Sequence, residues 1–175
     1  MSLFKRFSKD RRGVAAVEFA LIAPTMILMY CGLTELSQAI IAERKASHVA
    51  SAVGDLVAQT DTVSTGDLSD IFAIGATIMS PYPTSTLQER VTSITANAAG
   101  TPKVIWSRGS GMSALTTGAT VTLPLTLAAG DSIVMSEVKY QYTSVMKTVM
   151  PSATNYSEVF YLRPRRSDQV TCTGC

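Results

Sequence analysis

Two residues near the N-terminus, Gly13 and Glu18, have the types and the spacing that could support chemistry. Gly13 follows a basic run and precedes an apolar stretch in which Glu18 is the only residue of ordinary acidity. A cut between Gly13 and Val14 would release an α-amino group, whose reference pKa is about 7.7–8.0. The Glu18 carboxylate could neutralise that amine on its own chain or on a neighbour. The pattern therefore favours a proteolytic processing site at the start of a membrane segment.

Each of these residues also has a simpler interpretation. Gly13 lacks a side chain and is a poor helix former, so the bond before Val14 can lie extended for a protease; an ordinary loop glycine ahead of a helix has the same features. A carboxylate near the middle of a spanning helix costs on the order of 2.5–3.5 kcal/mol. Glu18 lies close to the start of the apolar stretch, where its side chain could instead reach back to water.

The apolar stretch of residues 14–33 predicts a transmembrane helix, because its 20 residues match the ~20 that a helix needs to cross a bilayer. Residues 1–13 form a basic leader, in which five Lys and Arg side chains stand against Asp10, a net charge of +4. By the positive-inside rule, this charge predicts a cytoplasmic N-terminus. The competing interpretation is a secretory signal peptide cut near Ala39, although such peptides have apolar regions of only about 7–15 residues.

The residues after the leader carry a small net negative charge. The whole chain carries +2, so residues 14–175 carry −2 once the +4 of the leader is removed. The exported part therefore has no overall charge that would attract nucleic acid. The short basic cluster at residues 163–166 is better explained as a solvated tail than as a binding site.

Residues 13–24, with the sequence Gly-Val-Ala-Ala-Val-Glu-Phe-Ala-Leu-Ile-Ala-Pro, resemble the N-terminal signature of TadE-like minor pilins (pseudopilins) of tight-adherence pili, also called Flp-type or type IVc pili. They are also similar to the broader type IV prepilin pattern, in which cleavage follows a glycine and the fifth mature residue is a glutamate. The resemblance covers roughly residues 9–60. Phe19 after Glu18 departs from the Glu-Tyr of the major Flp pilin, which favours a minor subunit.

The resemblance implies a prepilin cut after Gly13 and incorporated to initiate, anchor or cap a pilus that supports surface adhesion. The alternative is an envelope protein with an unrelated binding head, either secreted after a cut near Ala39 or anchored in the membrane. Its implied partners are a prepilin peptidase, other minor pilins, the major pilin, a membrane platform with a cytoplasmic ATPase, and the lipid bilayer. The implied location is the bacterial inner membrane, as a single pass with a periplasmic head, or the extracellular pilus. The family's helix also has a proline at the position of Pro24. A kink used in packing and simple tolerance of proline in a membrane helix explain it equally well.

The helix is expected to continue beyond the membrane as an amphipathic stalk over residues 34–60. At 100° per residue, one face is apolar and the other polar. The apolar face comprises Ala39, Ala42, Ala46, Val49, Val53, Leu56 and Val57. The polar face comprises Glu43, Arg44, Ser47, His48, Ser51, Asp55 and Gln59.

Residues 61–175 predict an α+β head with an antiparallel sheet, because a short helix is followed by a cluster of strands. The helix starts near Ser64 and ends at Ser80-Pro81. The predicted strands are Arg90–Ala98, Lys103–Ser107, Val121–Leu127, Ser132–Tyr142 and Ser157–Arg163.

The sequence contains no recognisable catalytic or cofactor motif, and we expect neither an enzyme nor a cofactor or metal. The single histidine, His48, lies on the polar face of the stalk, and Cys31 lies in the apolar span. Cys172 and Cys175 could form a small disulfide loop outside the cytoplasm or belong to a disordered tail.

Overall fold

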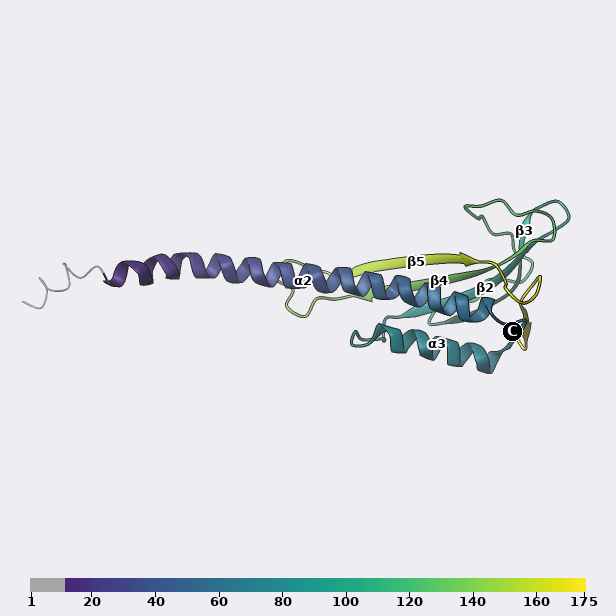
Figure 1. Ribbon diagram of the computed structural model, residues 1–175, viewed down its shortest axis with the longest axis horizontal. Coiled ribbons are helices and arrows are strands. Elements are labelled where there is room, and N and C mark those ends of the chain that lie inside the picture. Colours follow the sequence, from purple (N-terminus) through teal and green to yellow (C-terminus); the bar gives the residue numbers. More distant parts are fainter. Residues whose placement is uncertain (1–11) are drawn as a thin grey trace, which may run out of the picture. The chain divides into compact units, whose positions relative to one another are not determined.

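The computed structural model describes residues 12–175, so most of the predicted basic leader, residues 1–11, lies outside the described residues. Figure 1 shows the described elements, which are α2 (Arg12–Ala58), β1 (Thr62–Ser64), α3 (Thr65–Met79), β2 (Gln88–Ala96), β3 (Pro102–Ser110), β4 (Ser132–Tyr142), β5 (Thr154–Leu162) and β6 (Thr171–Thr173). The predicted α+β class, with a long N-terminal helix, a short second helix and an antiparallel sheet, is confirmed.

Contacts along the chain group these residues into two units. The first contains residues 12–38 of α2 together with the segment Thr143–Ser152. The second contains Ala39–Tyr142 and Ala153–Cys175, and so holds the remainder of α2, α3 and all the strands. The proposed domain boundaries after residues 13, 33 and 60 stay predictions.

In the second unit, the C-terminal part of α2 packs on a four-stranded sheet of order β3-β2-β4-β5, in which all neighbours are antiparallel. The predicted apolar face of the stalk is confirmed at six of its seven positions, which are buried, while Leu56 is half-buried. Gly54 allows the close approach, since a Cβ at this position would lie 2.5 Å from Leu162 Cδ1 of β5 and 3.0 Å from Ser136 Cβ of β4. The helix and the sheet therefore share one tightly packed core.

The second helix begins where the sequence predicts. The Ser64 side chain accepts a hydrogen bond from the backbone of Asp67, and the Asp67 carboxylate accepts one from the Ser64 backbone. This capping box satisfies two of the backbone donors that a helix N-terminus leaves free. The buried positions of α3 recur at helical spacing along one face, and Leu68 and Met79 among them are fully buried.

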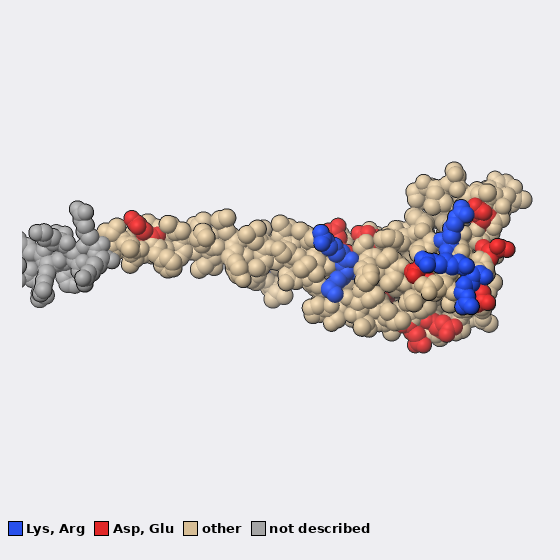
Figure 2. Space-filling model, viewed as in Figure 1, with Lys and Arg blue, Asp and Glu red and all other residues tan. Residues whose placement is uncertain are grey.

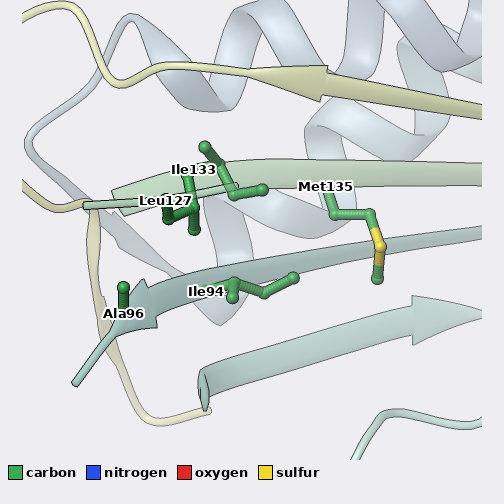
Figure 3. Close-up of a cluster of buried hydrophobic side chains, with 5 residues drawn as sticks. All are labelled: Ile94, Ala96, Leu127, Ile133 and Met135. Carbon is green, nitrogen blue, oxygen red and sulfur yellow. The ribbon is translucent and has the colours of Figure 1, made fainter. Parts of the chain in front are cut away.

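The predicted strand over Val121–Leu127 is wrong. Residues 121–127 form an irregular segment instead, because Pro124 in its centre has no N–H to donate to a sheet. Its apolar side chains pack on the sheet face opposite α2, where Leu127 meets Ile94 of β2 and Ile133 of β4. Figure 3 shows this cluster, which also includes Ala96 and Met135. The alternation in the sequence thus reflects burial of one side of a loop.

The other four predicted strands exist with small differences in their bounds, and β4 has the predicted ends. The short parallel pair of β1 and β6, in which Val63 lies opposite Cys172, was not predicted from the sequence. The indole N–H of Trp106 on β3 donates to the Val170 carbonyl at 2.8 Å. The C-terminal residues are therefore tied to the second unit, which removes the alternative of a disordered tail.

Candidate assembly site

The N-terminal part of α2 presents an apolar surface that nothing in the structure covers. Residues 13–31 are almost all exposed, including Phe19, Leu21 and Tyr30 at 72%, 73% and 69%. The helix is long and apolar enough to cross a membrane, and none of its most apolar stretch is buried. A core helix of a soluble protein would be buried, so this finding is compatible with a single-pass membrane anchor. Figure 2 shows the same stretch almost free of charged side chains.

Gly13 and Val14 lie in the first turn of α2, which begins at Arg12. The bond before Val14 is therefore helical in this structure, and a protease that needs it extended would have to unwind the first turn. The first four N–H groups of a helix have no partner within it, so unwinding this turn breaks few hydrogen bonds. A Cβ on Gly13 would meet no atom within 4 Å. A larger residue here would therefore leave the packing of the described chain unchanged.

Glu18 and Pro24 both lie on the exposed part of α2. Among the side chains that the structure describes, those of residues 13–175, none forms a hydrogen bond or ion pair with the Glu18 carboxylate. Pro24 lies inside α2, which continues on both sides of it. The structure brings neither side chain together with another predicted site residue.

Glu35 forms an interaction that the sequence analysis missed. Glu35 is 1% exposed, and its carboxylate accepts hydrogen bonds from three consecutive backbone N–H groups, those of Thr148 at 2.7 Å, Val149 at 2.8 Å and Met150 at 3.0 Å. Before these donors, Lys147 has a φ of 54°, a left-handed conformation that costs a residue with a side chain on the order of 1–2 kcal/mol. The three bonds offset this strain and fasten the segment Thr143–Ser152 to α2.

These bonds also set the charge of Glu35. Burial alone would raise the pKa of its carboxyl, but the backbone donors Thr148, Val149 and Met150, aided by the Ser144 hydroxyl, lower the pKa to about 2. The carboxylate is therefore ionised at neutral pH. Because the folded pKa lies below the ordinary 4.5, this interaction favours the folded state above pH 4.5 and is lost as the pH falls towards 2.

A second buried carboxyl, that of Glu89, has a pKa shifted in the opposite direction. It is 3% exposed on β2, and its Oε1 atom has no hydrogen-bond partner in the described chain. A Cβ on Gly75 of α3 would lie 2.0 Å from that oxygen, and Val49 of α2 lines the same spot. Burial therefore raises the pKa of Glu89 to about 7.

The two C-terminal cysteines, the histidine and the basic cluster noted in the sequence all lie in the described part of the chain. Cys172 and Cys175 are joined by a disulfide, and His48 is exposed on α2. In the basic cluster, Arg163 pairs with Asp131 at 3.3 Å, and Arg165 pairs with Asp55 of α2. These two arginines thus join parts of the second unit, whereas the sequence analysis treated the cluster as a solvated tail. Over residues 12–175, no group of three His, Cys, Asp or Glu side chains could hold a metal ion.

The comparisons with known proteins give a match on α2. No curated protein and no solved structure matches the chain significantly. A family model described as TadE-like protein matches residues 13–55, a range that holds Gly13, Glu18, Pro24 and Glu35. The match covers the exposed apolar part of α2 and most of its buried part. Residues 13–55 of this chain, about a quarter of its length, are therefore similar to TadE-like proteins.

Proposed function

We propose that this protein is a minor pilin of a tight-adherence pilus. In this proposal it is inserted as a prepilin, cut after Gly13, and incorporated to initiate, anchor or cap the pilus and so support adhesion. The similarity of residues 13–55 to TadE-like proteins supports an association with this class of pilus. The partners are a prepilin peptidase, other minor pilins, the major pilin and the membrane platform. The head lies in the periplasm, with the N-terminus in the cytoplasm.

The observation that carries the proposal is the division of α2 into two different surfaces. Up to residue 31 the helix is apolar and exposed nearly all round, and from Ala39 to Ala58 one face is buried against the sheet of its own chain. A helix that is apolar on every side needs lipid or other helices around it. The first part suits a bilayer and, after assembly, a bundle of neighbouring pilin helices, while the second part fixes the helix to its head.

Glu18 has a defined task in this scheme. Cleavage after Gly13 leaves a new amine on Val14, four positions from the Glu18 carboxylate, which no described residue satisfies. In a helical bundle surrounded by lipid, both charges are costly while they are unpaired. Pairing Glu18 with the amine of its own or a neighbouring subunit removes both costs at once. The pair then favours one register of the subunit in the assembly.

Intact mass spectrometry of the protein from its native membrane tests the processing step. Cutting after Gly13 removes the first 13 residues, and Gly13→Val should leave them attached while insertion continues. A loss of cleavage in this variant would reflect the processing site and not a packing defect, because the added Cβ meets no atom of the described chain within 4 Å. Gly66→Val, at an exposed position of α3, is a control substitution outside the processing site. A wild-type protein that keeps its leader, or one that starts at Ile40 after a cut near Ala39, would refute the proposal.

A further inference from the structure

The segment Thr143–Ser152, held by Glu35, presents a group of apolar side chains to its surroundings. Val145 is 97% exposed, Val149 60% and Met146 48%. Single apolar side chains on a surface are ordinary, but these three lie within five consecutive positions. Grouped exposed apolar side chains are typical of surfaces that meet a membrane or another protein. Lys147, also exposed, is the only charged side chain in the segment.

The contacts of this segment place it at one end of the apolar helix. Val149 packs over Gly32, since a Cβ at Gly32 would lie 2.9 Å from Val149 Cγ2. Gly32 belongs to the last turn of the predicted span of residues 14–33. Glu35 follows the last residue of that span by two positions, or about 3 Å along the helix axis. The segment therefore contacts the helix where it would leave the membrane.

We infer that the segment Thr143–Ser152 lies in the interfacial region of the non-cytoplasmic leaflet of the bilayer. Val145, Met146 and Val149 would then enter the boundary between head groups and acyl chains, and Lys147 would reach the phosphates of the phospholipids. The inference rests on the proposed function, which makes residues 14–33 the membrane span. The occupant is lipid because the apolar surface of the segment continues that of the span. Tyr30, exposed one turn before Thr34, is also typical of this interface.

Glu35 is the positioning residue of this contact. Backbone N–H groups that enter an apolar environment without a partner are costly, and a carboxylate there is costlier still. The three hydrogen bonds from Thr148, Val149 and Met150 satisfy both sides at once. The segment can therefore approach acyl chains without exposing these donors, and Glu35 is shielded from lipid.

The test uses the full chain in vesicles of phosphatidylcholine and phosphatidylglycerol, with a polarity-sensitive fluorophore on one cysteine. The free thiol of Cys31 is first removed by Cys31→Ser, while Cys172 and Cys175 stay disulfide-bonded. Separate variants then carry Val145→Cys, Met26→Cys in the span, or Thr116→Cys at an exposed position of the second unit. Lipids with a quencher near the head group or deep in the acyl chain report the depth of each probe.

We expect the probe at Val145 to emit at shorter wavelength than the probe at Thr116, and to be quenched most strongly by the shallow lipid label. If the probe at Met26 is quenched by the deep label, residues 14–33 lie in the bilayer. A probe at Val145 that then emits at the same wavelength as the probe at Thr116, and is not quenched, overturns the inference. A probe at Met26 that is not quenched would instead show that residues 14–33 do not span the bilayer, which contradicts the proposed function. Because Val145 is almost fully exposed, its substitution leaves the packing intact.

A second variant tests the role of Glu35. Glu35→Ala removes the acceptor of the three N–H groups, so the probe at Val145 should lose its quenching by the shallow label. Emission of Trp106, the single tryptophan of the chain and 5% exposed in the second unit, should stay unchanged. Quenching at Val145 that persists in Glu35→Ala would overturn the positioning role assigned to Glu35.

Discussion

The buried carboxyl of Glu89 makes the stability of the second unit depend on pH in a direction opposite to that of most acids. In the unfolded chain its pKa is the ordinary 4.5, and burial raises it to about 7 in the folded chain. Below pH 4.5 both states are protonated and burial carries no charge penalty. As the pH rises from 4.5 to 7, the unfolded chain releases its proton first, so the folded state loses relative stability.

The size of this effect follows from the two pKa values. A difference of one in pKa corresponds to 1.36 kcal/mol, so the change from 4.5 to about 7 corresponds to at most about 3 kcal/mol above pH 7. Glu89→Gln keeps the shape of the side chain and removes the proton equilibrium. Compared with the wild type, the variant should therefore gain about 3 kcal/mol in unfolding free energy between about pH 4.5 and about pH 8.

Urea unfolding of the full chain in detergent, followed by the fluorescence of Trp106, measures this difference. With an m value of about 2 kcal/mol/M, a difference of about 3 kcal/mol corresponds to a relative change of about 1.5 M in the urea concentration at the unfolding midpoint. Glu43→Gln, an exposed change on α2, is the matched control and should follow the wild-type profile. A midpoint difference between wild type and Glu89→Gln that is the same at both pH values would refute the reasoning.

Three further predictions concern assembly and the two faces of the sheet. Glu18→Ala should give a processed, membrane-embedded protein that fails to co-purify with other pilins, since the amine at Val14 loses its partner; recovery of the complex with normal pili would show that Glu18 is dispensable. Ala46→Asp should destabilise the second unit by burying an unpaired charge, whereas Asp at the half-exposed Ser51 should be tolerated, and limited proteolysis should separate the two. Glu137→Gln should weaken the two-bond pair with Arg90, at 2.6 and 2.8 Å, and lower the unfolding free energy by about 1–3 kcal/mol in urea titrations; an unchanged midpoint would contradict this estimate.

Features encoded over a few neighbouring residues could be predicted from the sequence. The apolar face of α2, the capping box at Ser64 and the ends of β4 depend on side-chain periodicity and on local hydrogen bonds, which are visible in the order of the residues. The N-terminal pattern around Gly13 and Glu18 is equally local, and the family match over residues 13–55 falls on it. The exposure of the apolar part of α2 was likewise expected from its composition.

Other features depend on contacts between residues that are far apart in the chain, and only the tertiary structure decided them. The donors to Glu35 lie more than 110 positions away, and backbone N–H groups leave no trace in residue types. A glutamate two positions after an apolar span was the one available signal. Residues 121–127 alternate as a strand does, yet Pro124 and burial on one face make them a covering loop. The order of residues shows which side chains prefer burial. The surface that buries them, and the partners that satisfy a buried charge, are fixed only when distant segments of the chain come into contact.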